Sequence, residues 1–350
     1  MSTDDNAEQR AEFGTDTSTT MTPSSTRIAI HEVAPRDGLQ MESCFVPTDD
    51  KVAWIDRLST LGYAKIEVTS FVSPAAIPAL RDAEQVMRRI QRAPGVEYTA
   101  LVPNARGAER AIDGRADEFN LVMSVSATHN LANLRMTQAQ SFRSLCNVVQ
   151  MAQQAGVAVN VSLSCAFGCP MEGPVPVSVV LDWINRFAAL GVQRVTLCDT
   201  TGMADPAQVL TLCRAAQVLH PGITYTAHFH DTRGLGGANV FAALQAGITR
   251  FDASLGGIGG CPYAPGASGN VATEDVVHLL QCMGRDCGMT VESLAGALAQ
   301  LRGLLGHELP SAIGRAGPRW QRHAPPADLE QIRERALARE QAVSARPEPG

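Results

Sequence analysis

Residues 251–270 read FDASLGGIGGCPYAPGASGN, and they lead from the end of an expected strand through a loop to the start of an expected helix. The run that leads into them, Arg250 to Leu255, alternates and carries Phe, Ala and Leu as a buried strand does. Six glycines and two prolines in the next fifteen residues exclude regular structure, and ATEDVV (272–277) then begins a helix. We therefore expect a strand, a mobile loop that carries the thiol of Cys261, and the amide of Asn270 at the end of that loop.

The same order of strand and helix repeats along the chain. Strands are expected at 27–34, 65–71, 96–102, 118–126, 158–164, 194–199, 224–230 and 250–255. Helices are expected near 48–62, 76–92, 105–113, 138–155, 176–190, 206–219, 236–247 and 273–285. Eight β/α units with glycines after the helices predict an α/β fold of the (β/α)8 barrel type rather than a doubly wound sheet. A further helix at about 290–306 would pack outside the barrel or on a partner.

The two ends of the chain differ from this pattern in composition. Residues 1–26 are rich in Ser, Thr, Asp and Glu and predict a disordered tail. Residues 27–310 hold the barrel. Residues 311–350 are rich in Arg, Pro, Glu and Ala and predict a flexible or helical tail, with a short polar helix at 327–343.

The overall composition limits the classes of function. A net charge of -6 gives no basic footprint for nucleic acid. No apolar run approaches the roughly 20 residues that span a bilayer, and the first residues lack the pattern of a secretory signal, so we expect a cytoplasmic protein. Nine cysteines form no paired framework, and Cys165 with Cys169 lacks the second pair that a zinc site needs.

A barrel concentrates chemistry at the carboxyl ends of its strands, and polar residues fall there in this sequence. They follow or end five of the expected strands and are Arg36, Asp37, Glu67, Ser70, Asp199, Thr200, Thr201, His228, His230, Asp231, Cys261 and Asn270. Glu67 taken by itself is explained equally well as a buried carboxylate whose hydrogen bonds are made within the core. The convergence of five strand ends favours a catalytic site.

His228 and His230 are two apart on a strand, so their side chains point to the same face and can hold one cation. Asp37 and Asn270 would add two oxygen ligands. This set without thiolates favours Mg²⁺ or Mn²⁺ over zinc or copper(I). With Arg36 at an enolate oxygen and Cys261 as proton donor, the residues fit a retro-aldol or retro-Claisen cleavage, or the reverse condensation.

Six motifs then resemble the 3-hydroxy-3-methylglutaryl-CoA lyase family over about residues 27–306. They are HEVAPRDGLQ (31–40), IEVTSFVSP (66–74), SCAFGCPMEG (164–173), CDTTG (198–202), HFHDTRG (228–234) and GIGGCPYAPGASGNVATEDVV (257–277). The resemblance implies a divalent-metal barrel lyase that cuts an acyl-CoA substrate, 3-hydroxy-3-methylglutaryl-CoA, into acetyl-CoA and acetoacetate, and a role in leucine degradation. It also implies the residue roles, in which the metal ligands are Asp37, His228, His230 and Asn270, and the catalytic residues are Arg36, Cys261, Asp199 and Glu67.

The sequence departs from this family on the substrate side of the barrel. Ser162 stands where the family carries Tyr, and Arg233 replaces a Tyr in the histidine motif. Together with Arg36 and Gln40, these two residues are our predicted substrate contacts. An added arginine can bind a carboxylate one carbon nearer the hydroxyl, so citramalyl-CoA, which gives acetyl-CoA and pyruvate, is the alternative substrate.

Two other kinds of protein remain as alternatives. A condensing synthase would share Arg36, Asp37, His228 and His230, but the cysteine loop belongs to the lyase branch. A non-catalytic scaffold would require the loss of a metal ligand or of the acid, and none is missing. We expect a homo-oligomer, namely a dimer.

Overall fold

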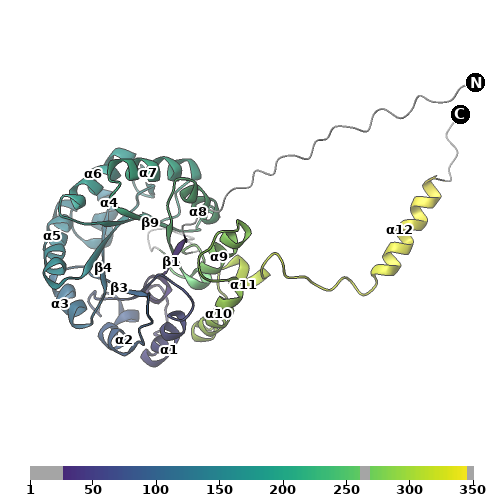
Figure 1. The fold of residues 1–350 in the computed structure, drawn as a ribbon, viewed down its shortest axis with the longest axis horizontal. Helices are drawn as coiled ribbons and strands as arrows, with labels where there is room; N and C mark the ends of the chain where they lie inside the picture. The colour runs from purple at the N-terminus through teal and green to yellow at the C-terminus, as the bar shows by residue number, and fades with distance from the viewer. Residues whose placement is uncertain (1–26, 261–268, 345–350) are drawn as a thin grey trace, which may run out of the picture.

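The computed structural model describes residues 27–260 and 269–344. The predicted disordered tail at 1–26 and the loop residue Cys261 lie outside the described residues. Figure 1 shows a ring of helices around a central barrel of strands, with the last helix projecting away from it.

Eight parallel strands close into a barrel in the order β1-β10-β9-β8-β5-β4-β3-β2, because β1 pairs with both β10 and β2. Their bounds are β1 Ala29–Glu32, β2 Lys65–Ser70, β3 Glu97–Leu101, β4 Glu118–Ser124, β5 Ala158–Ser164, β8 Arg194–Asp199, β9 Thr224–Phe229 and β10 Arg250–Ala253. The predicted (β/α)8 barrel and all eight of its strands are confirmed.

The helices that follow the strands form the outer layer. They are α1 Thr48–Leu58, α2 Ala83–Arg89, α3 Ala105–Asp113, α5 Gln138–Ala155, α6 Val177–Ala188, α7 Pro206–Leu219, α8 Gly236–Gln245 and α9 Thr273–Cys282. The predicted helix at 76–92 is shorter, because Pro78–Leu80 forms a separate 3₁₀ turn ahead of α2. A second 3₁₀ turn, Leu255–Gly257, follows β10.

The two faces of the strands differ sharply in polarity. One face is apolar and packs against the helices, as Ile66, Phe119 and Leu197 illustrate. The other face is polar, and its side chains join strands that are not neighbours: Arg194 on β8 contacts Glu97 on β3 at 2.6 Å. Because side chains alternate along a strand, this second face is the barrel interior. The interior is therefore a packed polar core.

Two elements near the barrel mouth were not predicted. The eight-residue helix α4, Ala127–Leu134, follows β4 and begins at the capping side chain of Ser126. A short antiparallel hairpin joins β6 Gly168–Cys169 to β7 Gly173–Pro174. The helix follows β4 and the hairpin follows β5, so both lie in connections that begin at the carboxyl ends of barrel strands.

The end of the chain packs partly on the barrel. The predicted helix at 290–306 is α10, Val291–Leu305, and α11, Ala312–Ala316, lies against α9 through hydrogen bonds to Asp275. The last helix, α12 Leu329–Ser344, matches the predicted polar helix. In the part of the chain that the structure describes, none of the helices is both long and apolar enough to cross a membrane.

Candidate active site and metal centre

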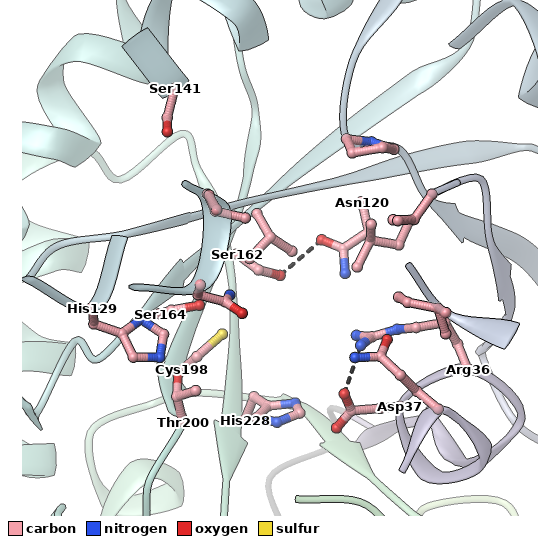
Figure 2. Close-up of a pocket in the computed structure, with 18 of the residues that line it drawn as sticks. Arg36, Asp37, Asn120, His129, Ser141, Ser162, Ser164, Cys198, Thr200 and His228 are labelled. Atoms are coloured by element: carbon pink, nitrogen blue, oxygen red, sulfur yellow. Dashed lines mark hydrogen bonds and ion pairs between the residues drawn. The ribbon is translucent and has the colours of Figure 1, made fainter. Parts of the chain in front are cut away.

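A cavity of about 680 Å³ opens at the carboxyl ends of the strands. Figure 2 shows its lining, in which Arg36 and Asp37 lie on one side and His129, Cys198 and Thr200 lie on the other. His228 projects between them. Every strand residue that lines this cavity belongs to the polar interior face, so the alternation of the strands decides which side chains reach it.

Arg36 and Asp37 lie just beyond β1, in the π-helical turn η1 at Ala34–Gly38. The wide turn lets both side chains project into the same cavity. Arg36 donates from Nε to Glu67 at 2.7 Å and from Nη1 to Asp37 at 2.5 Å. Nη2 also lies 2.6 Å from Oε2 of Glu67, so the guanidinium is held between two carboxylates and one N–H on each of Nη1 and Nη2 is left for a ligand.

His228 and His230 reach the cavity from the end of β9. Their Nε2 atoms lie 3.2 Å apart, and the rings meet at a tilted angle. Asp37, His228 and His230 each offer a ligand atom within 4.8 Å of the other two. The spacing that predicted a shared face holds for the two histidines, and the closure of the barrel brings Asp37 from the turn after β1 to them.

Asn270 completes this cluster from the segment that precedes α9. Its Nδ2 donates to Oδ2 of Asp37 at 2.7 Å, and an isolated bridge pairs its backbone with His230. Its Oδ1 is buried without a hydrogen-bond partner among the described residues, and Nδ1 of His230 is likewise unpartnered. Buried polar atoms without partners are costly. Two nitrogens, a carboxylate and an unfilled amide oxygen fit a divalent cation.

The charges of the site depend on one another. Burial alone would raise the pKa of Asp37, but the Arg36 guanidinium and the two histidines lower it below its usual value. Burial would lower the pKa of His228, and its hydrogen bond to Asp252 outweighs that effect and raises it. For His230, burial and then the neighbouring His228 lower the pKa to about 3. Asp37 is therefore ionised and His230 neutral, as cation binding requires.

Of the other predicted residues, some line the cavity and others hold the lining residues in place. Gln40 and Ser162 line the cavity. Ser162 donates to Oδ1 of Asn120 at 2.7 Å, where a tyrosine would instead fill space. Glu67 lies behind Arg36 and accepts from it and from Asn120, so it supports the guanidinium. The catalytic and substrate-binding roles of these residues stay predictions.

Asp199 and Arg233 do not line the cavity, although the carboxyl of Asp199 is close enough to His228 to interact with it electrostatically and its Oδ2 is buried without a hydrogen-bond partner among the described residues. Oδ1 of Asp199 accepts the backbone N–H groups of Met203 and Ala204 at 2.7 and 3.0 Å, and burial raises the pKa of its carboxyl to about 6. Arg233 is exposed and donates to the carbonyl oxygens of Thr201 and Gly202. Neither is among the described residues that line the cavity. Arg233 would have to release these carbonyls to contact a substrate.

Sequence reasoning missed several lining residues, among them Asn120, His129, Cys198 and Asp252. Three of them occupy interior positions of predicted strands, so a polar residue at an inward position was the available signal. His129 comes from the unpredicted helix α4 and had no such signal. Figure 2 shows its ring directed into the cavity.

A model of the HMGL-like family matches residues 27–300, which is most of the chain. This protein belongs to the HMGL-like family. It is therefore a carbon–carbon lyase, and its cluster of Asp37, His228 and His230 is a candidate divalent-metal site of the kind on which the family depends.

Named proteins resemble this chain over nearly their whole length. Hydroxymethylglutaryl-CoA lyase YngG of Bacillus subtilis is 45% identical, with 83% of this chain and 97% of that protein covered. The (R)-citramalyl-CoA lyase of Chloroflexus aurantiacus is 40% identical, covering 83% and 95%. An HMG-CoA lyase structure from Acinetobacter baumannii, solved with coenzyme A and 3-methylmalate, matches with a TM-score of 0.83 and 46% identity, covering 87% and 100%.

Proposed function

We propose that this HMGL-like protein cleaves 3-hydroxy-3-methylglutaryl-CoA into acetyl-CoA and acetoacetate, with Mg²⁺ or Mn²⁺ as its cofactor. The observation that carries the proposal is the cluster of Asp37, His228 and His230 beside Arg36 in one cavity. A site for a cation next to a fixed guanidinium suits a reaction that begins at a hydroxyl and ends at an enolate.

Asp37, His228, His230 and Asn270 would hold the ion. When bound, it lowers the pKa of the substrate hydroxyl and orients it. A base removes the hydroxyl proton, the C2–C3 bond breaks, C3 becomes the ketone carbon, and the electron pair moves to C2 as a thioester enolate. The remaining N–H groups of Arg36 stabilise the enolate oxygen. Cys261, which lies outside the described residues, is our proposed donor of the proton that C2 receives.

Citramalyl-CoA is the second candidate substrate, and two observations favour it. A relative with that name is 40% identical over most of both chains. Ser162 lines the cavity as part of a small polar network with Asn120 and Asn160, which leaves a different pocket from the one a tyrosine would make. Because one methylene in a pocket is worth only about 1–3 kcal/mol, we expect some cleavage of both compounds.

The test is an assay of purified protein against a small panel of 3-hydroxyacyl-CoA thioesters, including these two. We expect the higher kcat/KM with 3-hydroxy-3-methylglutaryl-CoA, no turnover in excess chelator, and recovery when Mg²⁺ or Mn²⁺ is added. Full turnover in chelator, with no metal in the protein, would falsify the metal assignment.

Cys261→Ser tests the proposed proton donor. We expect turnover to fall by roughly 10²–10⁴ with little change in substrate affinity, the range for a positioned acid. Turnover at the wild-type rate would show that this thiol is not the donor.

We further infer a homodimer in the cytoplasm, with a role in leucine degradation. The assigned substrate is the basis for that role. Sedimentation of the purified chain tests the dimer, since a monomer at assay concentration contradicts it.

A further inference from the structure

Asp252 connects a candidate metal ligand with the interior of the barrel. Its Oδ2 lies 3.3 Å from Nδ1 of His228, and its Oδ1 lies 2.9 Å from Nδ1 of His31. The strand register explains this row: His31 on β1 pairs with Asp252 on β10, which in turn pairs with His228 on β9. The three residues are adjacent only because the barrel closes between β1 and β10.

The contact decides which nitrogen of His228 can bind a cation. An ionised carboxylate accepts hydrogen bonds and has no proton to donate, so Nδ1 of His228 is the donor. In the neutral ring, which is the form that binds a metal, a proton on Nδ1 leaves Nε2 with its lone pair, and Nε2 is the atom that faces His230 at 3.2 Å. The ring is therefore fixed in both orientation and tautomer on the side that a metal would occupy.

We propose that Asp252 is a positioning residue for metal binding, that it directs Nε2 of His228 toward the cation, and that His31 holds Asp252 in place. Metal-binding histidines generally donate their second N–H to a carboxylate or carbonyl in this way. The proposal rests on the metal site assigned above, since it gives that site its outer support.

His31 is fixed by the same interaction. Its ring is buried, and its Nε2 has no hydrogen-bond partner among the described residues. Its other interior neighbour in the strand register is Lys65, whose ammonium is bound to Glu118. Without the Nδ1–H of His31, one oxygen of Asp252 would lose its partner, and the carboxylate could rotate away from His228.

The first test is Asp252→Asn, measured by calorimetric titration of the metal-free full-length protein with Mn²⁺. We expect Mn²⁺ affinity to fall by ~10- to 100-fold, the range for loss of an outer partner. In ¹⁵N NMR spectra of the histidine rings, wild-type His228 should carry its proton on Nδ1. The variant should show a mixture, because an amide can donate as well as accept.

A matched control is Asp82→Asn. Asp82 is also a buried carboxylate with two partners, Lys51 at 2.7 Å and Thr48 at 2.8 Å, but it lies among the outer helices. Its variant should bind Mn²⁺ as the wild type does. Equal Mn²⁺ affinity and an unchanged His228 tautomer in Asp252→Asn would overturn the proposal.

His31→Leu tests the hydrogen bond between His31 and Asp252, and it serves as the main test if Asp252→Asn does not fold. We expect a smaller fall in Mn²⁺ affinity, which His31→Asn should reverse because it restores an N–H donor. If His31→Leu binds Mn²⁺ as tightly as the wild type, His31 does not hold Asp252 in place. If Asp252→Asn also fails to fold, the same result overturns the whole proposal. If the wild-type protein itself binds no divalent metal, the proposed metal site is wrong. That result differs from normal metal binding in Asp252→Asn, which would contradict only the role of Asp252.

Discussion

At the amino-terminal end of the barrel interior, Glu118 lies between Lys65 and Arg194, and Glu97 also contacts both cations. At the carboxyl end, Asp37, His228 and His230 converge on a cavity, and the buried Oδ1 of Asn270 has no partner among the described residues. Both ends place charged or polar groups inside the barrel.

The difference between the two ends lies in how their charges are balanced. Two cations and two carboxylates pair with each other at the amino-terminal end, so that end needs no ligand. At the carboxyl end, acceptors outnumber the donors that surround them. Burial of polar groups therefore does not mark a site, whereas an excess of ligand atoms that lack hydrogen-bond partners and face a cavity does.

Glu118→Gln tests the closed end and should have the largest effect. Neutralising this fully buried carboxylate leaves Lys65 and Arg194 with one carboxylate between them. We expect a loss of about 3–5 kcal/mol in the free energy of unfolding, as for other broken buried pairs. Urea unfolding measures the loss, and Mn²⁺ affinity of the folded protein should not change.

Asp49→Asn is the control for that variant, because it removes one carboxylate from an exposed pair with Arg89. Its cost should stay within about 1 kcal/mol. If Glu118→Gln were as mild as this control, the amino-terminal network would not stabilise the barrel.

Arg36→Lys tests the open end without removing its charge. Lysine keeps a cation beside Glu67 and Asp37, but it lacks the planar fork that bonds both carboxylates and the substrate together. We expect kcat to fall by roughly 10²–10³, the range for loss of a donor to a developing oxyanion, with Mn²⁺ affinity nearly unchanged. A wild-type kcat would exclude the guanidinium from the reaction.

Glu274→Gln tests a buried oxygen that does not face a metal site. Oε1 of Glu274 is buried without a hydrogen-bond partner, yet among the described residues no cluster of metal-ligating side chains includes Glu274. Burial raises the pKa of this carboxyl to about 7. The folded state therefore holds the proton more tightly than the unfolded state does. Its stabilising contribution is complete below about pH 4.5 and is lost as the pH rises through 7.

Unfolding free energies measured from pH 5 to 8 check this assignment. Wild type should lose up to about 3 kcal/mol more than Glu274→Gln over this range, since each unit of pKa shift is worth about 1.4 kcal/mol. Parallel curves for the two proteins would show that the pKa of the Glu274 carboxyl is not raised in the folded state.

Ser162→Ala should have the smallest effect. It removes the hydroxyl that donates to Asn120, while Asn160 still donates to the same oxygen. We expect a change of about 1 kcal/mol, or roughly fivefold, in the ratio of kcat/KM between 3-hydroxy-3-methylglutaryl-CoA and citramalyl-CoA. An unchanged ratio would show that this wall of the cavity does not select the acyl group.

Local sequence signals predicted much of the barrel. Helices α5 and α7 match their expected bounds, and each begins at a capping box, at Thr137 with Gln140 and at Asp205 with Gln208. Helix α5 ends at Gly156, which adopts the left-handed conformation that stops a helix. Helix α4 was missed because eight residues with two inward polar side chains show too little periodicity to stand out from a loop.

The candidate site was predicted only where its residues follow a short-range rule. His228 and His230 share a face because side chains alternate along a strand, and the structure brings both to the cavity. Arg233 lies only three residues beyond His230, yet it turns away to the carbonyl oxygens of Thr201 and Gly202. Past the end of the strand, alternation no longer determines direction.

Periodicity and capping within a few neighbours predict the eight strands and most of the helices between them, although helix α4 and the separate 3₁₀ turn ahead of α2 were missed. Which polar residues meet depends on the tertiary structure. His31 and Asp252 are far apart in the chain and become neighbours when β1 pairs with β10. Barrel closure and strand register set that contact, and both depend on the packing of all eight units together.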